Sequence, residues 1–408
     1  MRPVLFLTTL VLAAAGIALW ANAPAAQAKP PDPVVAWNRE LLSILRTPGA
    51  QPATVQPTRN MALLHAAIGD AVTAIDHSAR PLLVRVDAPR RASREAAIDA
   101  AAHDVLAALY PSLRTQLDQL EAARIAAAPP GARRLEGLEA GRGVARLALA
   151  ARANDGSGAM PPPFVARSAP GDYRPTPPAF VAPVFTHWAA VRPFVLRAAA
   201  QFRPPAPPSG GRALEQVRAL GELAGTARTP DETQAARFWS APIQNYWNEI
   251  AQTAVIASRA DLDTSAHTFA ALDIALADAT IALYDAKYAY RVWRPVTAIR
   301  AGGDAAWTPL LNTPPDPSYP GAHSVIGAAG AAVLGAAFGD AYPLVVTSEA
   351  LPGVERRFAS FSAAVREAGL ARMWGGVHTS IDDSAGQQVG RSVGRYVVRA
   401  WFDRGARR

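Results

Sequence analysis

The sequence predicts an all-α protein built from packed helical bundles. Apolar residues recur at helical spacing through most of the chain, whereas the alternating pattern of a half-buried strand is scarce. Clusters of proline and glycine interrupt the helical stretches and mark their ends. With 408 residues, half of them hydrophobic, the chain can bury the core of one large or two ordinary domains.

Residues 1–28 have the pattern of a secretory signal peptide. Arg2 precedes an apolar run from Val4 to Trp20, and two A-x-A triplets follow, ending at Ala23 and Ala28. We therefore expect cleavage near Ala28 and a secreted or periplasmic mature protein. An uncleaved anchor helix ranks second because the apolar run is short for a membrane span, so no stable membrane anchor is predicted.

Residues 29–154 are predicted to form an N-terminal helical region. Its apolar periodicity runs over four stretches, Val34 to Leu45, Ala62 to Ile75, Ala96 to Leu109 and Leu113 to Ile125. Residues 155–212 are rich in proline and aromatic side chains and too apolar for a free linker. We expect this segment to wrap over the helical body.

Residues 213–408 are predicted to form a C-terminal helical bundle. Helical patterns resume at Leu214, and Thr229-Pro230-Asp231-Glu232 has the composition of a capping box that starts a helix. A long apolar helix through Phe269 and Leu283 places Lys287 near its C-terminal end. Three more helices are expected, over 324–338, 362–373 and 382–402.

Composition excludes several classes of site and partner. The chain has no cysteine, which rules out disulfides, thiolate metal ligands and a catalytic thiol. Its net charge of +8 comes from scattered arginines without a basic block interleaved with aromatics, so we predict no nucleic-acid partner. The sequence does not indicate an oligomeric state.

Three segments of the predicted bundle each combine a cation or an imidazole with a break in the backbone pattern. They are Lys287 to Pro295, Pro320 to Ser324, and Arg372 to His378. Lys287 is the only lysine after residue 30, which suggests that a compact ammonium is needed there. In the second segment, Gly321 and Ala322 immediately precede an apolar helix whose free N–H groups favour an anion.

Together these segments predict an oxyanion site. Lys287, Arg294 and Arg372 supply three positive charges, which suit a tetrahedral oxyanion of high charge. His323 and His378 add two imidazoles, so one can act as nucleophile or ligand while the other exchanges protons with an apical oxygen.

The order and spacing of these motifs, K-x6-R-P, then P-G-A-H, then R-x5-H, resemble the vanadium-dependent haloperoxidases and the type 2 phosphatidic acid phosphatases. The chain looks like a bacterial, secreted member of the haloperoxidase branch. The resemblance extends over most of the mature chain, including residues 63–71, 173–180 and 275–279.

The resemblance implies two packed helical bundles with the anion site in the C-terminal one. It implies that His378 bonds vanadium or attacks phosphorus and that His323 is the general acid and base. Lys287, Arg294 and Arg372 would hold the equatorial oxygens, with the backbone of Gly321 and Ala322 beside them.

Three functions remain open from the sequence. The first is a haloperoxidase-like enzyme that uses vanadate and hydrogen peroxide to oxidise a halide or a small organic donor. The second is an acid phosphatase that hydrolyses a phosphomonoester without a cofactor, through a phosphohistidine. The third is a degenerate, non-catalytic oxyanion binder.

Two departures from the family pattern bear on this choice. The motif P-S-G-H is Pro320-Gly321-Ala322-His323 here, so the serine hydroxyl that bonds the anion is missing. Asp316 stands where haloperoxidases tend to carry an aromatic residue or histidine, and a carboxylate there repels halide unless an arginine neutralises it. Asp382, one helical turn after His378, is expected to orient a ring or pair with an arginine.

Other conspicuous residues are predicted to be structural. No metal-ligand spacing links the five other histidines, His65, His77, His103, His187 and His267. The glycine and alanine run from Gly327 to Gly339 predicts tight helix packing. Four tryptophans are expected in the core or in pocket walls, namely Trp37, Trp239, Trp247 and Trp293, and Trp374 is expected to line the active site.

Overall fold

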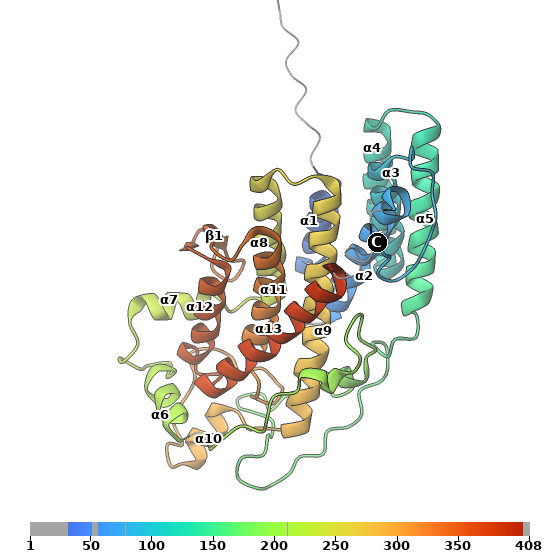
Figure 1. The fold of residues 1–408 in the computed structure, drawn as a ribbon. Helices are drawn as coiled ribbons and strands as arrows, with labels where there is room; N and C mark the ends of the chain where they lie inside the picture. Colours follow the sequence, from blue (N-terminus) through green and yellow to red (C-terminus); the bar gives the residue numbers. More distant parts are fainter. Residues whose placement is uncertain (1–31, 51–55, 78, 210, 403–408) are drawn as a thin grey trace, which may run out of the picture. The chain divides into compact units, whose positions relative to one another are not determined.

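The computed structural model describes residues 32–50, 56–77, 79–209 and 211–402. These residues form thirteen α-helices and one short β-hairpin, which confirms the all-α prediction (Figure 1). The hairpin pairs β1 (Leu344–Thr347) with β2 (Glu355–Phe358) in antiparallel register, and the sequence pattern did not predict it. Each strand has only four residues, which is too short to show a clear alternation of buried and exposed side chains. The predicted signal peptide lies outside the described residues.

Five helices come from the N-terminal region. They are α1 (Pro33–Arg46), α2 (Gln56–Asp76), α3 (Arg94–Leu109), α4 (Arg114–Ala127) and α5 (Ala132–Arg152). Helix α1 begins at the predicted place because the Asp32 side chain accepts the Val34 N–H at 2.8 Å and Pro33 occupies the first helical position. Helix α2 packs on α3, α5 and α9, so it joins this region to the long helix that bears Lys287.

Residues 155–209 run mostly without regular structure, apart from two short 3-10 turns, Trp188–Ala190 and Ala199–Phe202. A buried carboxylate on α9 fixes this segment. Asp278 accepts the backbone N–H groups of Phe194 at 2.7 Å and of Val195 and Leu196 at 2.8 Å. This part of the proline-rich segment therefore lies against α9.

Eight helices come from the C-terminal region. They are α6 (Gly211–Leu220), α7 (Pro230–Phe238), α8 (Ile243–Ser258), α9 (Leu262–Tyr290), α10 (Pro295–Ala301), α11 (Ala322–Phe338), α12 (Phe361–Trp374) and α13 (Ser380–Phe402). The predicted capping box is present at the start of α7, where Thr229 and Glu232 bond each other's backbone N–H groups. Helix α9 carries Lys287 in its last turn, as expected, and contacts α2, α8, α11 and α13.

The apolar composition of α9 has a structural explanation. Among the described residues it is the one helix long and apolar enough to cross a membrane, but 94% of its most hydrophobic window is buried inside the protein. Apolar residues all round a helix are expected when every face is covered by neighbours. Helix α9 therefore forms the centre of the core.

Glycines allow the helices behind the anion-site motifs to approach closely. Gly330 of α11 faces the Trp247 ring, and a Cβ there would lie 2.8 Å from it. On α13, a Cβ at Gly390 would lie 2.1 Å from the carbonyl oxygen of Val325 on α11. The glycine and alanine run thus serves tight helix packing, as expected.

We predict that Gly390→Ala lowers the free energy of unfolding by about 1 to 3 kcal/mol, because the new methyl forces α13 away from α11. Gly143→Ala is the matched control, since its Cβ would lie 3.9 Å from the Val86 methyls, an ordinary contact. That variant should gain about 0.5 to 1 kcal/mol of helix propensity. Urea unfolding of both variants measures the difference, and equal effects would contradict the packing account.

Candidate oxyanion site

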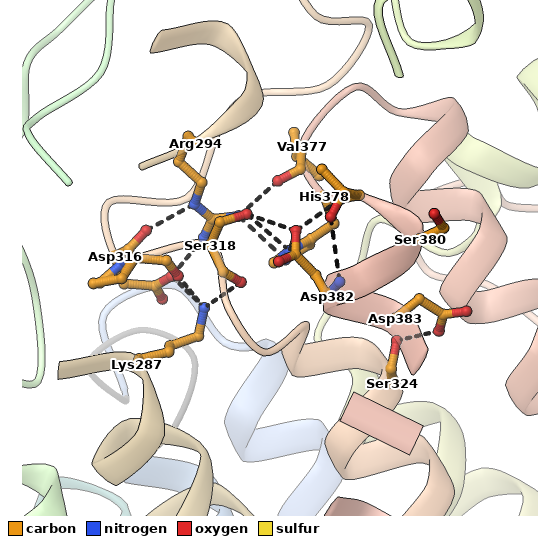
Figure 2. Close-up of polar contacts among 12 residues, drawn as sticks. Lys287, Arg294, Asp316, Ser318, Ser324, Val377, His378, Ser380, Asp382 and Asp383 are labelled. Atoms are coloured by element: carbon orange, nitrogen blue, oxygen red, sulfur yellow. Dashed lines mark hydrogen bonds and ion pairs between the residues drawn. The ribbon is translucent and has the colours of Figure 1, made fainter. Parts of the chain in front are cut away.

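The structure brings the predicted site residues together from the ends of several elements. Lys287 lies in the last turn of α9, Arg294 caps the start of α10, and His323 lies in the first turn of α11. Arg372 lies in the last turn of α12, and His378 follows in the loop before α13. Figure 2 shows Lys287, Arg294 and His378 around the loop that carries Asp316 and Ser318.

The backbone turns sharply between Lys287 and Arg294. Arg291 ends α9 in the left-handed conformation, with φ of 51°, and its N–H bonds the Lys287 carbonyl at 2.8 Å. Pro295 then begins α10. The turn leaves Arg294 almost fully buried, where Nη1 donates to the Val377 carbonyl at 2.8 Å and lies 3.1 Å from Nε2 of His378.

The Lys287 ammonium is fully buried and faces the loop 316–318. It lies 3.0 Å from Oδ1 of Asp316 and 3.3 Å from the Ser318 carbonyl, and it also donates to the Pro317 carbonyl. Three acceptors from one loop match the three donors of an ammonium. Burial lowers the pKa of Lys287 to about 8, so the group remains charged at neutral pH.

Asp316 bridges two of the predicted anion-binding cations. Arg294 bonds it twice, from Nη2 to Oδ1 and from Nε to the backbone carbonyl at 2.7 Å, and Tyr284 donates to Oδ2 at 3.0 Å. Burial alone would raise the pKa of Asp316, but the charges of Lys287 and Arg294 outweigh it and lower this pKa to about 2. The carboxylate is thus ionised, and the neighbouring cations compensate its charge. This meets the condition, stated from the sequence, that an arginine must neutralise a carboxylate at this position if it is not to repel halide.

The His378 ring is held through its Nδ1 edge. Nδ1 lies 3.4 Å from Oδ2 of Asp382, and this carboxylate also accepts the Ser318 hydroxyl at 2.8 Å and the Thr379 N–H at 2.7 Å. Arg294 can only donate, so Nε2 accepts from it and the ring proton belongs on Nδ1. Asp382 therefore lies where it can orient the His378 ring, which is the role that the sequence predicted for it.

Glycine is required just before His378. Gly376 has φ of 77°, and a Cβ on it would lie 2.5 Å from the Gly221 carbonyl oxygen. The Val377 N–H then bonds the Arg372 carbonyl at 3.1 Å, which closes the loop between α12 and α13. This tight turn directs His378 back toward Arg294.

Arg372 and His323 carry polar atoms that have no hydrogen-bond partner within the described part of the chain. Nε and Nη1 of Arg372 are buried without a hydrogen-bond partner there, as is Nε2 of the partly buried His323. Burial, then the charge of Arg294, lowers the pKa of Arg372 to about 10. Burial, then the charges of Arg372 and His378, holds the pKa of His323 well below its usual value. Buried polar atoms without partners are unusual, and the two free donors of Arg372 are suited to an anion.

The backbone of the second motif offers fewer free N–H groups to an oxyanion than the sequence suggested. The Gly321 N–H bonds the Asp382 carbonyl at 2.9 Å, so it is not available to an oxyanion. Ala322 begins α11, where the first N–H groups lack partners within the helix. Ser318 and Ser324 do not restore the motif hydroxyl, because Ser318 bonds Asp382 and Ser324 bonds Asp383 (Figure 2).

Sequence reasoning missed Ser318 and Tyr284. Ser318 bonds the carboxylate that holds His378, and Tyr284 bonds Asp316. Neither residue has a spacing signal, because their partners lie 64 and 32 positions away. Of the tryptophans, Trp293 lines a cavity of about 450 Å³ that also touches Ser318 and Asp382, whereas Trp374 packs against the main core.

The five remaining histidines stay outside this group. His65 is buried against Asp273, with Nδ1 2.5 Å from Oδ2, and His103 lies 2.8 Å from both Asp104 and Asp118. Within the described ranges, no cluster of three or more histidine or acidic side chains could hold a metal ion.

The pKa of His378 predicts a stability effect. Burial, then the charge of Arg294, lowers this pKa from 6.5 to about 3, so between these values only the unfolded chain binds the proton. The folded state therefore loses stability as the pH falls through this window. His378→Gln should remove about 1.4 kcal/mol per pH unit from the slope, measured by urea unfolding across the window. An unchanged slope would show that His378 titrates normally.

Comparisons with known proteins find similarity over the part of the chain that contains these residues. Residues 267–403, which contain every predicted site residue, match the family model described as the VCPO second helical-bundle domain. The structure of a bacterial vanadium-dependent iodoperoxidase is similar over 90% of this chain and 96% of that chain, with a TM-score of 0.81 and 26% identity. In this region and in its fold, the chain is similar to the vanadium-dependent haloperoxidases.

Two further haloperoxidase relatives extend the comparison. Vanadium chloroperoxidase from Curvularia inaequalis is 27% identical over 138 residues, a match that spans 26% of this chain and only 23% of that protein. The holo form of a bacterial vanadium-dependent chloroperoxidase has a TM-score of 0.69 at 16% identity, covering 88% of this chain and 95% of that chain. The latter likeness shows a shared haloperoxidase fold.

Proposed function

We propose that this protein is a vanadate-dependent enzyme that uses hydrogen peroxide to oxidise a halide or another two-electron donor. The observation that carries the proposal is the set of buried, unpartnered atoms on Arg372 and His323 beside the oriented ring of His378. A tetrahedral oxyanion would satisfy these atoms, so the residues present fit vanadate. The similarity to a bacterial iodoperoxidase supports the same proposal and makes iodide the first halide to test.

In this proposal, His378 would hold vanadate through Nε2 in place of its contact with Nη1 of Arg294, while Asp382 keeps the proton on Nδ1. Arg372 would donate its free N–H groups to the oxyanion. His323 is neutral at neutral pH and carries the unpartnered Nε2, so it can accept and return a proton. Bound vanadate would supply the activation of hydrogen peroxide toward a two-electron donor.

A paired assay on the purified protein tests the proposal. Oxidation of iodide and bromide is measured with hydrogen peroxide, with and without vanadate, beside hydrolysis of a phosphomonoester without vanadate. We expect vanadate-dependent oxidation of at least one halide. Hydrolysis that vanadate inhibits, without halide oxidation, would replace the proposal with the phosphatase, and silence in both assays would leave the non-catalytic binder.

A further inference from the structure

We infer that Asp316 sets the charge of the oxyanion that this site accepts, so that a singly charged tetrahedral anion binds in preference to a doubly charged one. The inference rests on the proposed function because it concerns the same pocket. It assigns to Asp316 a role in specificity that the three motifs do not predict.

The first support is geometric. Both oxygens of the Asp316 carboxylate are occupied, Oδ1 by Lys287 at 3.0 Å and by Arg294, and Oδ2 by Tyr284 at 3.0 Å. The residue is only 6% exposed, so solvent does not screen these contacts strongly. The Asp316 carboxylate is thus the counter-ion of two of the three cations in the motifs, Lys287 and Arg294.

The second support is the use of the donors. Lys287 meets three acceptors of the loop 316–318, and Arg294 uses Nε, Nη1 and Nη2 on groups of the protein. Arg372 differs from both, because its Nε and Nη1 have no partner among the described residues. An arriving oxyanion therefore finds one uncommitted cation at the end of α12.

The third support is the balance of charge. The oppositely charged side chains of the site are the cations Lys287, Arg294 and Arg372 and the carboxylates Asp316 and Asp382, so the cations exceed the carboxylates by a single positive charge. A singly charged anion neutralises this excess. A doubly charged anion leaves one negative charge uncompensated in a buried site, which is unfavourable.

The alternative role for Asp316 is to position Lys287 and Arg294 for the anion. The two roles predict opposite results for Asp316→Asn, which keeps the shape of the side chain and removes its charge. Under the charge-setting role the variant binds doubly charged anions more tightly. Under the positioning role it binds all anions less tightly.

Isothermal titration calorimetry of the full chain in mildly acidic buffer decides between them. Inorganic phosphate then carries one charge and sulfate carries two. We expect the wild-type protein to bind phosphate at least about tenfold more tightly than sulfate, and Asp316→Asn to bind sulfate at least about tenfold more tightly than the wild type does. Asp383→Asn, which removes a carboxylate that bonds Ser324 and Gln387 instead, should leave both affinities unchanged.

Each outcome is decisive. Equal binding of the two anions by the wild type, or sulfate binding that Asp316→Asn weakens or leaves unchanged, overturns the inference, and the wild-type comparison requires no variant to fold. If halide oxidation persists in such a case, the proposed function stands without the inference. If no anion binds to either protein and no oxidation occurs, both are overturned.

Discussion

We expect His378→Ala to abolish the proposed vanadate-dependent oxidation, with a loss of at least about a thousandfold in kcat/KM. Under the proposed function, Nε2 of this ring, which accepts from Arg294 in this structure, would hold the oxyanion while Asp382 holds Nδ1. Alanine has no atom that could take its place. Steady-state rates at varied halide concentration and saturating hydrogen peroxide measure the loss. The same variant tests the phosphatase alternative, which also requires His378.

His187→Ala is the control for a general effect of losing an imidazole. His187 lies on the proline-rich segment, where Nε2 is 3.3 Å from the Ser157 carbonyl. We expect this variant to retain the wild-type rate. Full activity of His378→Ala would remove the assignment of this ring as ligand or nucleophile.

Arg372→Ala should have opposite effects on anion binding and on stability. Two buried donors are lost, each worth about 1.5 to 3 kcal/mol toward a charged acceptor, so the vanadate dissociation constant should rise at least about a hundredfold. Without an anion, however, Arg372 is a buried charge whose Nε and Nη1 have no partner in the described structure. Its removal should therefore raise the unfolding temperature of the anion-free protein.

Arg366→Ala on the same helix separates these effects from a loss of arginine in general. Arg366 is exposed, so its replacement should leave both the dissociation constant and the unfolding temperature near the wild-type values. Calorimetric titration with vanadate and a thermal melt provide the two readings. If Arg372→Ala lowered the anion-free melting temperature, the side chain would be serving a structural contact instead.

The fold could be predicted from sequence because its signals are local. Apolar periodicity predicted α1, α2 and α9, and the Thr229 capping box predicted the start of α7, since caps and amphipathic faces depend on residues a few positions apart. The hairpin of β1 and β2 escaped because strands of four residues hardly alternate.

The sequence could predict that the candidate site residues lie near one another, but it could not predict their hydrogen bonds and ion pairs. Motif spacing identified Lys287, Arg294, Arg372 and both histidines, and the structure places them in one electrostatically coupled group. The commitment of Lys287 and Arg294 to Asp316 depends on side-chain contacts across more than twenty residues, which spacing does not encode. The bond from the Gly321 N–H to Asp382 escaped for the same reason.

The most direct test of the account is a crystal structure of the protein soaked with vanadate. We predict density for a tetrahedral or five-coordinate oxyanion joined to Nε2 of His378, with the Arg372 guanidinium turned toward its oxygens and Asp316 still paired with Lys287. Vanadate bound away from His378, or an empty site with Arg372 still unpartnered at saturating vanadate, would contradict the account.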